Sequence, residues 1–197
     1  LGSQDFDALL LRLEAEESSP VAGDLLVEAL RAAPTIDEAR TVFSLHEPAL
    51  STADQKRAAY QELGFLEELA GNYQRALWAY ERILALDSGN ETARLRAAAA
   101  ALEIGDNERA EQPARYIIDS ARDRRAQRTA ALYLSMVKFR EDDRQEGLPL
   151  LRSLTAGESR GTVEAETLVF GFLAASRWGE TAYAGEMREK LERLYPG

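Results

Sequence analysis

The chain has 197 residues, of which 45% are hydrophobic and 29% are charged, a composition typical of a folded globular protein. Its formal net charge of −10 argues against general nucleic-acid binding, because phosphate contacts require clustered Lys and Arg side chains. The sequence has no cysteine, which excludes disulfide frameworks, thiolate metal sites and cysteine nucleophiles. No apolar run approaches the roughly 20 residues that a membrane-spanning helix needs.

The spacing of apolar residues predicts helices along the whole chain. Apolar side chains recur at intervals of three and four residues and strict alternation is rare, so we expect an all-α fold. Ser51 with Asp54, and Asn90 with Glu91, offer N-terminal caps for two helices. About eleven helices are expected, at residues 5 to 18, 20 to 33, 35 to 47, 52 to 70, 72 to 87, 90 to 104, 107 to 121, 124 to 141, 144 to 156, 161 to 178 and 180 to 195.

Three glycines reveal a repeat. Gly71, Gly105 and Gly179 stand where a helix would end in a left-handed residue, in "ELAGNYQRAL", "LEIGDNERAE" and "SRWGETAYAG". The first two stops are 34 residues apart, and in "FREDDRQEGL" Asp142 takes the place of the glycine. Because the connections are short, successive helices must be antiparallel neighbours, and the pattern predicts stacked helical hairpins.

The clearest copy, "LGFLEELAGNYQRALWAYERILALDSGN", resembles the tetratricopeptide repeat (TPR) motif. Ser88 stands where the family often has proline, and Ile83 where it has a small residue. Gly64 and Ala76 carry little or no side chain, so two helices could approach closely there. The resemblance implies a right-handed superhelical solenoid of antiparallel helix pairs. The matching residues are Leu63, Gly64, Gly71, Tyr73, Ala76, Tyr80, Asp87 and the closing Asn90.

The repeat pattern predicts one TPR-like domain over residues 1–197. Residues 1–19 would form a capping helix, 20–56 a degenerate repeat and 57–90 the clearest repeat, with divergent repeats at 91–127, 128–160 and 161–197. Pro113 and Pro149 fall at nearly equivalent places in successive second helices, and an interior proline removes a backbone hydrogen bond. Those helices should therefore kink, altering the superhelical curvature, or begin later than drawn.

Few residues could carry chemistry. His46 is the only histidine, and a lone histidine without a second ligand is a poor metal site, so we expect it to be structural or on the surface. No Gly-x-Ser-x-Gly turn is present, and the runs of Asp and Glu lie at helix ends and on polar faces. We expect no enzymatic activity and no cofactor or metal. One basic cluster, Arg122, Arg124, Arg125 and Arg128, could receive an acidic partner or a phosphate, or be a solvated loop.

The resemblance also implies where a partner would bind. In TPR folds the first helix of each pair lines the concave face, and ligands usually lie in that groove. The Lys and Asn residues of the TPR proteins that clamp chaperone C-termini are absent here. The groove would be apolar with polar flanks, suited to an amphipathic helix or an extended hydrophobic peptide; alternatively, its residues contact one another or the N-terminal helix and are core. The groove positions are Gln61, Phe65, Glu68, Leu95, Ala99, Leu132, Met136, Phe139, Val169 and Leu173, flanked by Arg96, Arg140 and Arg177. Leu102 and Ser176 continue the same helix faces.

These features predict a noncatalytic protein-protein interaction scaffold or adaptor that binds a protein or peptide partner and no nucleic acid. Two alternatives are an accessory substrate-positioning domain of a larger enzyme and a helical pocket for a small apolar ligand, lined by Phe65, Met136, Phe139 and Phe172. The Ala, Leu and Arg usage indicates a bacterial source. The ending "LERLYPG" is similar to repeat ends of bacterial envelope TPR proteins, and the chain begins without Met, so we expect a periplasmic or envelope lipoprotein whose anchor precedes these residues.

Overall fold

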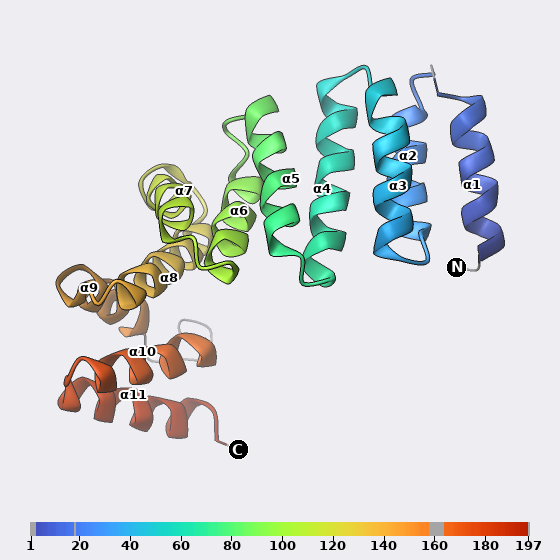
Figure 1. Cartoon of the computed structure of the whole chain (residues 1–197). Coiled ribbons are helices and arrows are strands. Elements are labelled where there is room, and N and C mark those ends of the chain that lie inside the picture. The colour runs from blue at the N-terminus through green and yellow to red at the C-terminus, as the bar shows by residue number, and fades with distance from the viewer. Residues whose placement is uncertain (1–2, 18, 158–163, 197) are drawn as a thin grey trace. The chain divides into compact units, whose positions relative to one another are not determined.

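The computed structural model describes residues 3–17, 19–157 and 164–196, and these residues form eleven α-helices, one short 3₁₀ helix and no strand (Figure 1). The predicted all-α fold of about eleven helices is confirmed. The helices are α1 (Ser3–Ala15), α2 (Ala22–Ala32), α3 (Ile36–His46), η1 (Glu47–Ala49), α4 (Ala53–Leu69), α5 (Tyr73–Leu86), α6 (Glu91–Glu103), α7 (Asn107–Ser120), α8 (Arg124–Arg140), α9 (Arg144–Thr155), α10 (Ala165–Arg177) and α11 (Thr181–Leu194).

The predicted helix ends differ from these bounds by a few residues. The predicted start at residue 161 lies outside the described residues, and α10 begins at Ala165. Ser51 was the wrong choice of cap, because the Thr52 hydroxyl accepts a hydrogen bond from the Gln55 backbone N–H at 3.1 Å, and the Thr52 backbone N–H donates to Gln55 Oε1 at 3.2 Å. This reciprocal pair is a capping box. Asn90 is confirmed as a cap.

The four predicted helix stops adopt the left-handed backbone conformation. Gly71, Gly105 and Gly179 have φ values of 73°, 78° and 74°, and Asp142 has φ 59°. Glycine enters this region without strain because it lacks a Cβ, and aspartate is among the few other residues that tolerate it. Asp142 also accepts a hydrogen bond from Trp178 Nε1 at 3.1 Å, which ties this stop to the end of α10.

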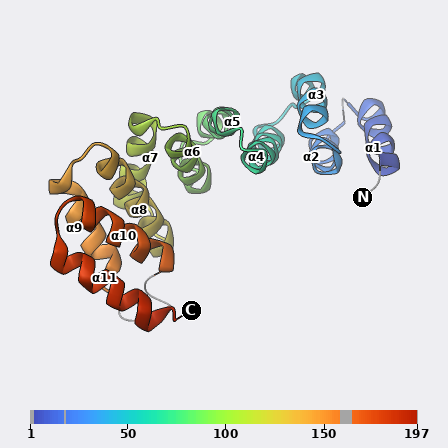
Figure 2. The same ribbon diagram turned by 60° about the horizontal axis from the view of Figure 1, so that its bottom comes forward.

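The chain divides into two compact units, residues 1–106 and 107–197, with the boundary in the turn before α7. In unit 1, α1 packs on α2, α2 packs on α3 and α4, and α5 packs between α4 and α6. In unit 2, α8 contacts both α7 and α9, α9 contacts α10, and α10 pairs with α11. Figures 1 and 2 both show the hairpins α4–α5 and α10–α11 as neighbouring helices joined by tight turns. Each unit is thus a stack of helices that are neighbours in sequence.

Small residues set how closely the helices of a hairpin approach. A Cβ on Gly64 would lie 2.8 Å from the Tyr80 ring, and a Cβ on Gly147 would lie 2.6 Å from the Trp178 ring. Tyr80 is fully buried, so its ring has no room to withdraw. The close contact that the sequence predicted at Gly64 is therefore present, and unit 2 has its own version at Gly147.

Both interior prolines lie within continuous helices. Pro113 belongs to α7, which begins at Asn107, and Pro149 belongs to α9, which begins at Arg144. The alternative that these helices begin after their prolines is wrong. Each proline lies beyond the first turn and has no backbone N–H, so α7 and α9 continue through it with one helical hydrogen bond fewer.

Candidate functional site

The thirteen positions predicted to bind a partner lie on the first helices of the repeats. They are distributed over α4, α6, α8 and α10, and six of them are exposed whereas the other seven are partly buried. Leu102, which continues the face of α6, is 4% exposed and belongs to the core. In unit 1 they are Gln61, Phe65 and Glu68 on α4 and Leu95, Arg96 and Ala99 on α6; in unit 2 they are Leu132, Met136, Phe139 and Arg140 on α8 and Val169, Leu173 and Arg177 on α10.

In unit 1, Arg96 joins the two first helices. Its Nη1 lies 2.5 Å from Glu68 Oε2, and its guanidinium lies over the Phe65 ring, 5.6 Å from the ring centroid. Phe65 is still 41% exposed, which is unusual for a phenylalanine. Three predicted residues from two helices therefore converge into one surface feature, an exposed ring with a fixed cation above it and a carboxylate beside it.

Unit 2 repeats this arrangement. The Arg177 guanidinium of α10 lies 4.6 Å from the centroid of the Phe139 ring of α8. Phe139 packs edge-on against Phe170 at 5.5 Å and against Trp178 at 5.7 Å, so it is held more firmly than Phe65. In both units a guanidinium from one first helix covers a phenylalanine of the preceding first helix, a contact worth about 0.5–1 kcal/mol when exposed.

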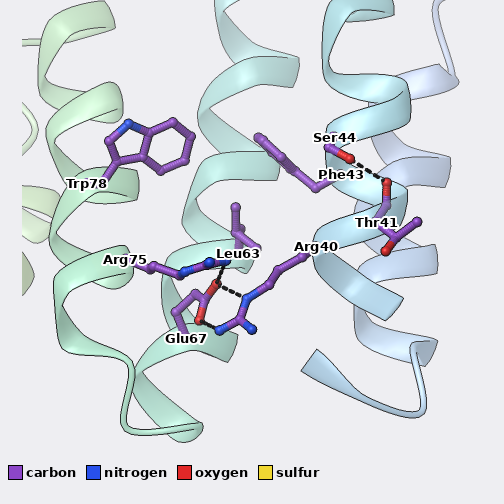
Figure 3. Close-up of a pocket in the computed structure, with 8 residues that line it drawn as sticks. All are labelled: Arg40, Thr41, Phe43, Ser44, Leu63, Glu67, Arg75 and Trp78. Carbon is purple, nitrogen blue, oxygen red and sulfur yellow. Dashed lines mark hydrogen bonds and ion pairs between the residues drawn. The ribbon is translucent and has the colours of Figure 1, made fainter. Parts of the chain in front are cut away.

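Sequence reasoning missed a pocket on the second helices of unit 1. It has a volume of about 410 Å³ and lies between α3, α4 and α5 (Figure 3). The Trp78 indole forms one wall, and it packs edge-on against Tyr60, which in turn contacts Phe43. Burial and the hydrogen bond to Glu47 raise the pKa of Tyr60 to about 12, so its hydroxyl stays protonated well above the pH at which an ordinary tyrosine ionises. The lining residues are Arg40, Thr41, Phe43, Ser44, Leu63, Glu67, Arg75 and Trp78.

A buried carboxylate closes one end of this pocket. Glu67 is 1% exposed, and Arg40 donates to both of its oxygens, from Nε at 2.8 Å and from Nη2 at 2.6 Å. Arg75 approaches the same carboxylate from α5 at 4.0 Å, as Figure 3 shows. The hydrogen bond to Glu67 raises the pKa of Arg40. Both oxygens of Glu67 are thus occupied, and the group links α3, α4 and α5 instead of offering a free acid or base.

Unit 2 contains the same three positions with every charge reversed. Arg40, Glu67 and Arg75 each precede a partner of opposite charge by 71 residues, which is also the interval between the stops Gly71 and Asp142. The equivalent residues are Glu111, Lys138 and Glu146. Lys138 is 6% exposed, and its Nζ lies 2.9 Å from Glu111 and 3.7 Å from Glu146, with Glu141 at 2.9 Å as a fourth member. We call these two groups the ion triads. A comparison of the sequence with itself at this interval shows the reversed charges, but not that each set of three lies together.

The remaining chemical candidates have structural surroundings. His46 is nearly buried at the end of α3, with Nδ1 3.6 Å from Glu17 Oε1, as expected of a structural or surface histidine. Across residues 3–17, 19–157 and 164–196, no three His, Asp or Glu side chains are grouped so as to hold a metal ion. The same ranges contain no helix with the length and apolar character to cross a membrane.

The class of protein follows from this geometry: the chain is an all-α helical-repeat protein with the TPR-like fold. Its structure is similar to the crystal structure of a tetratricopeptide repeat protein from Parabacteroides merdae ATCC 43184, with a TM-score of 0.68 over 97% of this chain and 73% of that chain. The two sequences are 15% identical, so the likeness concerns the fold. No protein-family model and no curated protein sequence matches the chain. TPR-like folds commonly act as protein-interaction scaffolds and are typically not catalytic.

Proposed function

We propose that this protein is a noncatalytic adaptor that binds an amphipathic helix or an extended apolar peptide on the first helices of its repeats. The observation that supports the proposal is the exposure of large apolar side chains on those helices. Phe65, Val169 and Leu173 are 41%, 45% and 54% exposed. Second helices carry exposed apolar side chains as well, among them Leu45 and Tyr116, so the choice of the first helices rests on the TPR-like fold, in which ligands usually lie on those helices.

The arginines beside these residues would supply selectivity. Arg96 and Arg177 already lie over aromatic rings, so their guanidinium groups are ordered before a partner arrives. Little side-chain entropy is then lost on binding, and the remaining N–H donors can receive carboxylates of the partner. A partner helix with apolar residues on one face and acidic residues along its edges would match this surface.

Site-specific photocrosslinking in the native host tests the proposal. A photoreactive phenylalanine analogue at Phe65 or Leu173 should give a discrete crosslinked species that mass spectrometry identifies. Leu45 is the matched control, because it is 64% exposed but lies on a second helix, α3. The proposal fails if position 45 gives the same species with the same yield, or if positions 65 and 173 give none.

We also propose that the protein works in a bacterial envelope compartment. The support is the C-terminal "LERLYPG", which is similar to repeat ends in bacterial envelope TPR proteins. Fractionation of the native host with an antibody against this domain tests the location. Recovery of the protein with the cytoplasmic fraction alone would contradict it.

A further inference from the structure

Three arginines of the cluster in unit 2 form a charged surface that the fold does not use. Arg122, Arg124 and Arg125 are exposed, and their side chains form no ion pair or hydrogen bond with the residues that the structure describes. Asp123, the acid between them, caps α8 by accepting from the Arg125 backbone N–H at 2.9 Å. In a chain where 34 acids outnumber 24 lysines and arginines, cations without partners are unexpected.

The position of the cluster makes it costly for the fold. Arg124 and Arg125 occupy the first turn of α8, which contains no acidic residue. The N-terminal end of a helix carries a partial positive charge, so cations there weaken the helix where an Asp or Glu would strengthen it. Stability therefore does not explain these arginines, and an anionic ligand would.

A pocket lined by two arginines of the cluster, Arg124 and Arg128, together with four apolar residues indicates what else the ligand carries. It has a volume of about 370 Å³ between α7, α8 and α9, the size of a site for a small ligand or a few side chains. None of its lining residues is acidic. Arg128 is fixed at its rim, because Nη2 donates to the Leu154 carbonyl at 3.0 Å. The lining residues are Ile118, Arg124, Gln127, Arg128, Ala131, Leu150, Ser153 and Leu154.

We propose that this pocket binds a short acidic peptide segment, with one aliphatic side chain among the apolar residues and neighbouring carboxylates on Arg124 and Arg128. A small inorganic anion would make no contact with the apolar lining residues, which are Ile118, Ala131, Leu150 and Leu154. A long polyanion such as a nucleic acid would be repelled by the acidic surface of a chain whose net charge is −10. A short segment would interact mainly with the arginines close to it, because salt screens the more distant charges. None of the residues that line this pocket is among the thirteen predicted partner-binding positions, so this proposal can be tested separately from the surface on the first helices.

Fluorescence polarisation with designed peptides tests the proposal on the full chain. The probe is a fluorescein-labelled peptide with one leucine flanked on each side by two glutamates and capped by glycines. We expect saturable binding that weakens at least tenfold when glutamine replaces the glutamates, and several-fold when alanine replaces the leucine. Binding should also weaken as salt rises, because the contacts are charged.

Two variants make the test specific. Arg124→Glu should weaken binding at least tenfold while leaving the melting temperature unchanged or higher, because the acid suits the start of α8. Arg12→Glu is the matched control: it is exposed on α1 and changes the net charge equally, and it should bind as the parent does. The proposal is overturned if the two variants bind alike, if the glutamine peptide binds as well, if millimolar inorganic phosphate displaces the probe completely, or if the acidic peptide does not bind.

Discussion

Replacing Glu67 by glutamine should destabilise unit 1 more than any surface change. The amide keeps the shape of the side chain but removes the charge that holds Arg40 through two short hydrogen bonds. Breaking a buried ion pair from one side costs about 3–5 kcal/mol. The Glu67 side chain is 2% exposed, but that of Arg40 is 23% exposed, so water can partly solvate the released guanidinium. We therefore expect a loss of about 2–3 kcal/mol.

A loss of this size is easily measured. At about 4–8 °C per kcal/mol for a unit of roughly 100 residues, the melting temperature of unit 1 should fall by roughly 10–20 °C. Circular dichroism gives the melting curve, and hydrogen exchange should show lost protection in α3 and α5 first. Asp54→Asn is the control, because it breaks the exposed ion pair with Arg57 and should cost at most about 0.5 kcal/mol.

Reversing all three charges of the ion triad in unit 1 tests whether its contribution to stability is electrostatic. Arg40→Glu, Glu67→Lys and Arg75→Glu together give unit 1 the charges that unit 2 has at the same positions. If the interaction is electrostatic and the backbone is equivalent, this triple variant should recover at least half of the stability lost in Glu67→Lys alone. A cost below about 1 kcal/mol for Glu67→Gln, or a triple variant no more stable than Glu67→Lys, would show that the ion pair of Arg40 and Glu67 does not stabilise unit 1.

Three further substitutions test other parts of the fold. Burial alone would raise the pKa of Glu111, but hydrogen bonds from its basic partners, Lys138 among them, outweigh it and hold that pKa below its usual value. Because the pKa of Glu111 is lower in the folded than in the unfolded protein, its carboxylate stabilises the fold above pH 4.5, and this stabilisation is lost as pH falls through the folded pKa. In urea titrations between pH 7 and 3, the free energy of unfolding should therefore decline less for Glu111→Gln than for the parent. Gly64→Ala should cost about 1–3 kcal/mol by chemical denaturation, because the new methyl group would meet the buried Tyr80 ring, and a neutral result would contradict the packing. Asp142→Ala should lower the melting temperature through backbone strain and a lost hydrogen bond, whereas Asp142→Asn should stay close to the parent.

The fold was largely predictable because local chemistry determines it. Gly71 and its counterparts end helices through their own backbone freedom, and even the aspartate at position 142 could be placed by alignment. The cap before α4 was misplaced by one residue, because Ser51 and Thr52 are both good cap residues and Gln55 Oε1 accepts from the backbone N–H of each. Only the hydrogen bond from the Gln55 backbone N–H to the Thr52 hydroxyl separates them.

The ion triads and the pocket of Figure 3 could not be predicted from local sequence patterns, because they depend on contacts between residues of different repeats. In the sequence Glu67 cannot be distinguished from the other acidic residues, because its partner Arg40 lies 27 residues earlier and only the fold brings the two together. The predicted positions on the first helices differ in exposure. Phe139 packs against two other rings, so its replacement would test the fold, whereas Leu173 is 54% exposed and its replacement tests binding.

The affinity of the crosslinked partner for charge variants tests the proposed function most directly. Phe65→Glu and Leu173→Glu together place a charge on the first helices of each unit, and Leu45→Glu with Tyr116→Glu does the same on exposed second-helix positions. Calorimetric titration of the purified partner should give an affinity at least tenfold weaker for the first pair and within about twofold of the parent for the second. The circular dichroism spectra of both double variants should match that of the parent, which shows that the fold is intact. Equal losses for both pairs, or an unchanged affinity for the first, would contradict binding on the first helices.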